Sequence, residues 1–415
     1  MELLLIILAI LLVLIAIAKV LNAKELVDGL KDNGDETVTS AEIKTNALGL
    51  LVFAIVMFAL LIAQIVGWDK YMLPSSASVH GEEIDTLMEV TMILILGVFF
   101  VTQALLFWFG FKYYFRKGRK AFWFPHDNKL EMAWTIVPAT VLILLITYGM
   151  STWDSIMNPE DNDNNLNVEF VSEQFGWTTR FAGEDNELGE ASFALYGSNA
   201  VGVATKKAII ERLEECKESI LVLQKDSLRL EKLVAKDWNR GENLDAVESS
   251  LKNYRSNILR LDRMLADYKK FPKKYDAGKD DKVINAKNIK LPKGRTIKFQ
   301  FRSKDVIHSA FFPHFRAQMN AVPGMKTFFT FQPRVTSEEF NANAIEEGKV
   351  FLKTERDDDG NILSQVETPG STGFLLLCNK ICGASHYNMK VFIEVVEEKE
   401  FNRWLADQKA FESAD

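Results

Sequence analysis

Two cysteines, a histidine and a methionine stand close together near the end of this 415-residue sequence. They fall within twelve residues, directly after the apolar segment Gly373–Leu377, and are Cys378, Cys382, His386 and Met389. Thiolates and thioethers are soft ligands and imidazole is intermediate, a combination that selects copper over hard cations. One further cysteine, Cys216, makes the count odd, which argues against a disulfide framework. The spacing therefore predicts a metal site.

A second histidine stands upstream, in the run Asp305-Val-Ile-His308-Ser309 that follows the segment Thr296–Phe301. Because a β-sandwich brings the ends of distant strands together, we expect His308 to meet the C-terminal ligands. Zinc is the competing metal for two cysteines and two histidines, although structural zinc sites use no methionine. Taken alone, His308 is also compatible with a purely structural role. The residues favour copper and leave zinc open.

The region around these ligands reads as a β domain. Several short segments alternate with a period close to two and are rich in β-branched and aromatic residues, namely Val168–Val171, Thr296–Phe301, Thr327–Phe331, Gly373–Leu377 and Val391–Val396. Proline and glycine bound several of them, which predicts a small β-sandwich or barrel.

A charged helical segment from Thr205 to Lys270 interrupts this β pattern. Its apolar residues recur in steps of three and four, from Ile209 to Val234 and again from Leu244 to Tyr268, with a break at 239–243. This pattern predicts two coiled-coil helices that fold back on each other as an antiparallel hairpin joined by a Gly-Glu-Asn turn. Cys216 falls on the apolar seam, so we expect it to be buried. A surface insertion of this kind costs a β domain little stability.

The N-terminal part of the chain is far more apolar. Four segments have the length of about 20 residues needed to cross a bilayer, namely Glu2–Leu21, Ala47–Val66, Met92–Phe111 and Ala133–Trp153. The basic run between the third and fourth segments, from Lys112 to Lys120, predicts a cytoplasmic loop, because positive charge stays inside. Everything after Trp153 is then expected outside. The same parity favours a retained first segment over a cleaved signal peptide.

The net charge of the chain excludes few classes of function. The chain carries a charge of -7 with acids and bases mixed, so no basic surface of the kind that binds nucleic acid is indicated. A weakly acidic exterior is compatible with a basic protein partner.

The run from Cys378 to Met389 resembles the dinuclear CuA motif of cytochrome c oxidase subunit II. The family's other signatures are similar here too: Asp305–Ser309, Val322-Pro323-Gly324, and Glu131-Met-Ala-Trp134-Thr135-Ile-Val-Pro138 at the head of the fourth span. The resemblance covers roughly Met92–Trp153, Asn167–Phe181 and Leu291–Trp404.

By that resemblance, Cys378 and Cys382 bridge two copper ions. His308 and His386 bind one copper each, Met389 is a weak ligand, and the main-chain carbonyl of Lys380 supplies the sixth contact. The family usually has glutamate at position 380, which helps to bind magnesium or manganese beside the large subunit. A lysine cannot ligate a cation, so that ion is either absent or bound without help from this chain.

Three further residues are implicated by the resemblance. Phe175 falls where the family commonly has the tryptophan that receives the electron, and Trp177 keeps a neighbouring tryptophan. Either is expected to serve as an exposed docking aromatic or as core. Glu131 resembles the glutamate at the cytoplasmic mouth of a proton channel into the large subunit, although a carboxylate at a helix N-terminus is also favourable by itself. His126 and His314 have no clear chemical setting.

The resemblance implies an α+β membrane protein, in which a transmembrane helical anchor precedes a cupredoxin-like β-sandwich with the inserted antiparallel coiled-coil hairpin. The expected divisions are an extension with two extra spans (1–90), the subunit II helical hairpin (91–153), the CuA domain (154–204 and 271–405), the insertion (205–270) and a tail (406–415). The implied localisation is the bacterial inner membrane, with the CuA domain on the periplasmic side.

The implied function is to pass single electrons from cytochrome c, or from a membrane-bound haem c donor, to haem in subunit I, where oxygen is reduced and protons are pumped. Expected partners are subunit I and further oxidase subunits, within a respiratory supercomplex if the extra spans and the inserted hairpin dock another complex. A copper-free quinol oxidase subunit is disfavoured by the intact ligands, and a copper carrier by the Glu131–Pro138 signature. Nitrous oxide reductase has a second copper-binding region that this chain lacks.

Overall fold

The computed structural model describes residues 40–116, 118–120, 122–159, 164–197, 199–234, 241–285, 287–356 and 362–412, with isolated positions between 12 and 23. The chain divides into two compact units. One comprises Met1–Trp68 and Val90–Leu142, and the other comprises Asp69–Glu89 and Ile143–Asp415.

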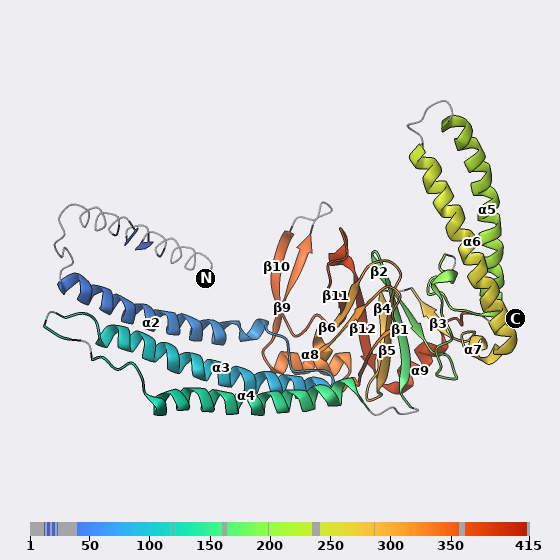
Figure 1. The fold of residues 1–415 in the computed structure, drawn as a ribbon. Coiled ribbons are helices and arrows are strands. Elements are labelled where there is room, and N and C mark those ends of the chain that lie inside the picture. Colours follow the sequence, from blue (N-terminus) through green and yellow to red (C-terminus); the bar gives the residue numbers. More distant parts are fainter. Residues whose placement is uncertain are drawn as a thin grey trace. The chain divides into compact units, whose positions relative to one another are not determined.

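Three helices among the described residues are long and apolar enough to cross a membrane (Figure 1). They are α2 (Ser40–Trp68), α3 (Val79–Lys112) and α4 (Asn128–Met157). They contain the second, third and fourth predicted spans, which are thereby confirmed as helices. The predicted span Glu2–Leu21 lies almost wholly outside the described residues. The α4 helix begins where the Asp127 carboxylate accepts hydrogen bonds from the Lys129 and Leu130 amides, at 2.9 and 3.1 Å.

Two five-stranded sheets form the β-rich part of the second unit. The first has the order β3-β2-β1-β5-β8, built from Lys282–Ile284, Gly176–Phe181, Leu166–Glu173, Ile297–Ser303 and Thr327–Phe331. The second has the order β4-β12-β11-β6-β7, built from Asn288–Pro292, Lys390–Val396, Phe374–Cys378, His308–Phe312 and Ala317–Ala321. All five predicted strands are present.

Phenylalanine rings from both sheets fill the space between them. Phe170 on β1 lies 6.0 Å from Phe312 on β6, and Phe299 on β5 lies 5.5 Å from the same ring, measured between centroids. These side chains are at most 1% exposed. Alternating apolar residues on each strand therefore build one shared core, as the period of two predicted.

The charged helical segment forms α5 (Lys206–Val234) and α6 (Gly241–Lys270), which lie side by side, followed by the short α7 (Pro272–Asp276) (Figure 1). Cys216 is fully buried in a cluster with Ile209 and Leu261, as expected. The predicted Gly-Glu-Asn turn is wrong, because α6 already begins at Gly241. Amides in the first turn of a helix have no intrahelical partner, so glycine and asparagine cost little there.

Further elements were not predicted. They are α8 (Ser337–Glu346), a two-stranded sheet of β9 (Val350–Arg356) and β10 (Ile362–Pro369), α9 (Glu398–Ala406), and the short 3₁₀ helices Asp69–Tyr71, Phe193–Leu195, Pro313–Phe315 and His386–Asn388. A capping box starts α8, in which Thr336 and Glu339 bond each other's backbone amides. This Thr-x-x-Glu spacing was a readable helix signal.

A buried ionic network, formed by Glu169, Arg180, Arg302 and Asp281, lies under the segment that leads into α5. Glu169 Oε2 lies 2.8 Å from Arg180 Nε and 2.8 Å from Arg302 Nη2, and Arg180 Nη1 lies 3.0 Å from Asp281 Oδ2. The arginines also donate to the carbonyls of Gly189 and Val201, at 3.0 and 2.7 Å. The network therefore fastens Gly189 and Val201, in the segment that leads into α5, to strands β1, β2 and β5.

The two carboxylates of the network differ. Burial opposes ionisation of Glu169, but Arg180 and Arg302 outweigh it and lower the pKa of Glu169 to about 2. For Asp281, burial outweighs Arg180 and raises the pKa to about 7. Glu169 is thus the charged centre of the network.

Candidate metal centre

Two adjacent strands bring the upstream histidine to the cysteine loop. His308 is the first residue of β6 and Cys378 is the last residue of β11. The strands pair antiparallel, with Cys378 opposite Ala310, so His308 and Cys378 lie near the same end of the sheet. The pairing of β6 with β11 therefore also brings His308 and Cys378, two of the candidate ligands, close together.

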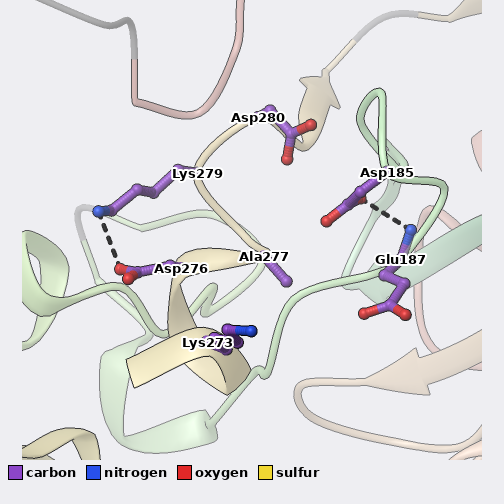
Figure 2. Close-up of a pocket in the computed structure, with 7 residues that line it drawn as sticks. All are labelled: Asp185, Glu187, Lys273, Asp276, Ala277, Lys279 and Asp280. Carbon is purple, nitrogen blue, oxygen red and sulfur yellow. Dashed lines mark hydrogen bonds and ion pairs between the residues drawn. The ribbon is translucent and has the colours of Figure 1, made fainter. Parts of the chain in front are cut away.

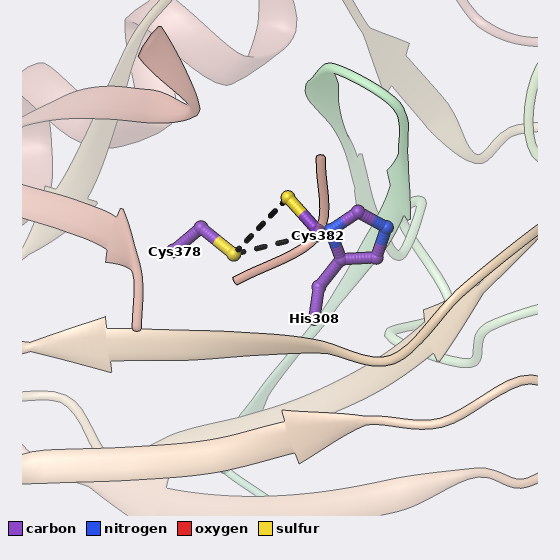
Figure 3. A group of neighbouring side chains, drawn as sticks. All are labelled: His308, Cys378 and Cys382. Carbon is purple, nitrogen blue, oxygen red and sulfur yellow. Dashed lines mark hydrogen bonds between the residues drawn. The ribbon is translucent and has the colours of Figure 1, made fainter. Parts of the chain in front are cut away.

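Three side chains converge closely enough to hold a metal ion (Figure 3). Cys378 Sγ lies 3.9 Å from Cys382 Sγ and 3.9 Å from His308 Nδ1. The three potential ligand atoms all lie within 4.8 Å of one another. The cysteines are unpaired, and their separation far exceeds the disulfide bond length of about 2.05 Å.

The remaining predicted ligands gather around the same sulfurs. Cys382 Sγ lies 3.5 Å from His386 Nδ1 and 3.3 Å from Met389 Sδ, and Cys378 Sγ lies 3.2 Å from the carbonyl oxygen of Lys380. Met389 is 1% exposed, whereas Lys380 is exposed to solvent. We refer to His308, Cys378, Cys382, His386 and Met389 as the metal cluster.

Four of the five side chains of the metal cluster are buried in spite of their polar atoms, and His386 is half-buried. His308 is fully buried, and the cysteines are 9% and 6% exposed. Burial, and then the neighbouring sulfur of Cys378, raise the pKa of Cys382 to about 11. A cation between the sulfurs would stabilise the thiolate form that burial disfavours, so the donor set fits a soft metal.

Asp305 orients the upstream histidine. Its Oδ1 lies 2.9 Å from His308 Nε2. Burial opposes ionisation of Asp305, but hydrogen bonds from His308 and from the Gln174 and Val306 amides outweigh it and lower its pKa. Because an ionised carboxylate only accepts hydrogen bonds, Nε2 carries the proton and the Nδ1 lone pair faces Cys378. The sequence showed the Asp-x-x-His spacing, but this role was not deduced from it.

The two candidate electron-entry aromatics occupy different environments. Trp177 on β2 is 5% exposed and packs edge-on against His308, with centroids 6.1 Å apart. Phe175, in the turn between β1 and β2, is 38% exposed. Its ring lies so close to Gly383 that a Cβ there would be 2.8 Å from Phe175 Cζ. The core position therefore belongs to Trp177 and the surface position to Phe175.

The other singled-out residues are not part of the metal cluster. Glu131 lies in the first turn of α4, and its carboxylate is 3.7 Å from His126 Nδ1. His314 is buried, with Nε2 3.5 Å from Ser371 Oγ, and burial lowers its pKa to about 4. His314 is therefore a neutral imidazole packed among buried side chains, a role that the sequence did not reveal.

A surface pocket elsewhere in this unit has a different character (Figure 2). It is lined by Asp185, Glu187, Lys273, Asp276, Ala277, Lys279 and Asp280. Lys279 already pairs with Asp276 at 2.8 Å, and the lining offers no sulfur or imidazole. Its lining carries four carboxylates and two lysines, and it shares no residue with the metal cluster.

Comparisons with known proteins agree on one family. Residues 65–151 match the family model described as the cytochrome c oxidase subunit II transmembrane domain. The chain is 22% identical over 303 residues to the alternative cytochrome c oxidase subunit 2 of Bradyrhizobium diazoefficiens, covering 72% of this chain and 71% of that protein. It is 20% identical over 331 residues to the cytochrome c oxidase subunit 2 of Cereibacter sphaeroides, covering 80% and 77%.

Solved structures overlap with parts of the chain. The periplasmic domain of subunit II of cytochrome oxidase from Bradyrhizobium japonicum is 24% identical, with a TM-score of 0.19. The match covers 30% of this chain and 64% of the solved chain. A chain of a heme-copper terminal oxidase dimer is 18% identical, with a TM-score of 0.17, and covers 28% and 52%.

Proposed function

Because this chain is a subunit II-like membrane protein whose homologues indicate a cytochrome c oxidase subunit II, we propose that it is the copper-bearing, electron-entry subunit of such an oxidase. It would accept single electrons and pass them to haem in subunit I, where oxygen is reduced and protons are pumped.

The observation that carries the proposal is the arrangement of two histidines around two shared sulfurs. Ligand atoms on one metal lie within about 4.6 Å of one another, twice a metal–thiolate bond of about 2.3 Å. The ligand atoms of His308, Cys378 and Cys382 lie within 4.8 Å of one another, close to this limit, but His386 is not in that group and approaches Cys382 instead. A single tetrahedral zinc would need all four. A pair of metal ions would take one imidazole each, so His308 and His386 could both serve as ligands, and this supports the dinuclear copper assignment.

The bound copper pair would supply the one-electron redox step. The chain's own residues hold the sites for it: Cys378 and Cys382 offer bridging thiolates, His308 and His386 one imidazole each, and Met389 and the Lys380 carbonyl the weaker contacts. Asp305 keeps the proton on His308 Nε2, so that Nδ1 remains available. Strands β6 and β11 would limit movement of His308 and Cys378 between oxidation states.

Electron and proton entry are proposed at separate places. Phe175, exposed above Gly383, is the candidate aromatic through which a cytochrome c or a membrane-bound haem c donor would deliver electrons. Glu131 is the candidate mouth of a proton channel into subunit I. Lys380 in place of the family's glutamate argues against help from this chain in binding magnesium or manganese.

The finer architecture is proposed on the same basis. The β-rich part of the chain would be a cupredoxin-like CuA domain (154–204 and 271–405) on the periplasmic side of the bacterial inner membrane. Helices α5 and α6 would form an inserted antiparallel coiled-coil hairpin (205–270). Together with the extra spans of the extension (1–90), that hairpin would dock a partner complex within a respiratory supercomplex.

Copper content and electron paramagnetic resonance of the purified full-length protein test the proposal. We expect two copper ions per chain that share one unpaired electron. One zinc ion, a single copper with a localised electron, or no metal after copper loading would each contradict it. The last result would favour a copper-free, quinol-type subunit.

A further inference from the structure

The turn between β1 and β2 touches both segments that carry the metal ligands. Gln174, in this turn, donates from its side-chain Nε2 to the carbonyl oxygen of Cys382 at 2.5 Å. Its backbone amide donates to Asp305 Oδ2 at 2.7 Å. One residue thus contacts the downstream ligand loop and the carboxylate that orients the upstream ligand.

Asp305 carries this contact on to the imidazole. While Oδ2 accepts from the Gln174 amide, Oδ1 accepts from His308 Nε2 at 2.9 Å and from the Val306 amide at 2.7 Å. A carboxylate with three such donors has little rotational freedom, so the imidazole plane is fixed relative to the turn.

The loop on the other side is built for close contact. Gly383 has φ +140°, and a Cβ there would lie 2.8 Å from Phe175 Cζ and 3.0 Å from Gln174 Nε2. The absent side chain lets the turn rest directly on the loop. Residues 379–381 of the same loop are exposed, and the Asn379 amide donates to the Ser309 carbonyl oxygen at 3.0 Å, so the Gln174 contact is a second restraint on this loop.

We propose that Gln174 is a positioning residue that clamps the two ligand-bearing segments together, its side chain fixing Cys382 and its backbone amide fixing His308 through Asp305. The clamp holds the separation of the sulfurs and the upstream imidazole before and after metal binding. It rests on the proposed copper function and adds a residue that touches no metal.

Two substitutions separate the hydrogen bond from mere space filling. Gln174→Met keeps the length of the side chain and removes the donor, whereas the backbone amide contact with Asp305 persists. Gln174→Asn keeps a donor on a shorter stem. The matched control is Gln332→Met, because Gln332 Nε2 likewise donates to a main-chain carbonyl, that of Gly294, outside the metal cluster.

The experiment uses full-length protein loaded with copper. We expect Gln174→Met to bind two copper ions but to release them to a chelator about tenfold to a hundredfold faster, as is typical when an outer hydrogen bond to a ligand is removed. Amide hydrogen exchange across 379–385 should also accelerate, Gln174→Asn should lie between, and Gln332→Met should behave like the unaltered chain.

Equal copper release and equal hydrogen exchange in Gln174→Met and the unaltered chain would overturn the clamp. Failure of the unaltered chain itself to hold two coppers would instead refute the proposed function. Faster exchange spread over the whole β-rich part, with equal copper release, would mean that Gln174 only stabilises the fold and would also overturn the clamp.

Discussion

The metal cluster and the ionic network are two buried polar groups in the same β-rich part of the chain, and they are built on opposite plans. In the ionic network, two carboxyl groups and two guanidinium groups contact one another and two main-chain carbonyls at 2.7–3.0 Å. In the metal cluster, the cysteine sulfurs lie 3.2–3.9 Å from each other, from the Met389 thioether, from His308 Nδ1 and from the Lys380 carbonyl oxygen.

The difference separates a group whose partners are other protein atoms from a group whose donor atoms fit a soft cation. Buried charges must be paired, and the ionic network achieves this with protein atoms alone. Two thiols beside two imidazoles gain little from one another, yet together they present the donors that a soft cation needs. Stability is therefore expected to depend on the first group and copper chemistry on the second.

The largest effect is expected from Cys382→Ser. A hydroxyl is a poor substitute for a bridging thiolate, so the shared-electron copper signal should vanish and oxidase turnover should fall about a hundredfold or more. The matched control is Cys216→Ser, at the buried cysteine between α5 and α6, which should retain both coppers. If Cys382→Ser retained the copper signal, the metal cluster would not be the copper site, and the contrast with the ionic network would fail.

Glu169→Gln should have the converse effect. Removing the shared carboxylate leaves two buried arginines without their central partner, which typically costs about 3–5 kcal/mol of unfolding free energy. Glu394→Gln removes a partner of Lys290 on the surface and should cost no more than about 1 kcal/mol. Denaturant unfolding of the full chain in detergent measures both.

If copper loading of folded Glu169→Gln matches the unaltered chain, the separation between the two groups holds. If Glu169→Gln and Glu394→Gln unfold at the same denaturant concentration, the ionic network stabilises the fold no more than a surface ion pair does.

The two groups also differ in how far sequence reveals them. The five side chains of the metal cluster were each singled out from the sequence as candidate ligands, because four of them lie within twelve residues and soft side chains are rare. The ionic network was not predicted, because its members are spread from Glu169 to Arg302 on separate strands and loops. A charged residue on a strand looks the same in sequence whether it faces water or a covering segment.

Local signals likewise decided which parts of the fold were predictable. A period of two located five of the strands, a period of three to four located α5 and α6, and long apolar runs located the three apolar helices. Glu169, Arg180 and Arg302 sit on strands whose covering segment begins far along the chain, and that pairing depends on tertiary contacts. Gln174 and Asp305 are similar, since their contacts exist only once β1, β2 and β5 have assembled.

A smaller effect is expected at the edge of the metal cluster. Asp305→Ala removes the acceptor that fixes the His308 tautomer, and should weaken copper binding about tenfold to a hundredfold. Asp305→Asn retains a neutral acceptor and should fall between. Copper transfer to a chelator, followed by absorption, ranks the three proteins. Equal rates in all three would mean that strand β6 alone orients the imidazole.

The smallest effect is a pH dependence within the ionic network. The pKa of Asp281 is raised from 3.8 to about 7, so between these values the folded chain holds more protons at this site than the unfolded chain does. The free energy of unfolding should therefore fall as pH rises through this window, and the loss should be complete above it. Glu169, with a pKa of about 2, stays ionised throughout and adds no slope near neutrality. Asp281→Asn should remove the Asp281 share of the slope, so that its thermal midpoint changes by a few degrees less between about pH 5 and about pH 8. If the slope of unfolding free energy against pH were unchanged in Asp281→Asn, Arg180 would keep Asp281 ionised. Both carboxylates of the ionic network would then be permanent charges, and the contrast with the metal cluster would be sharper still.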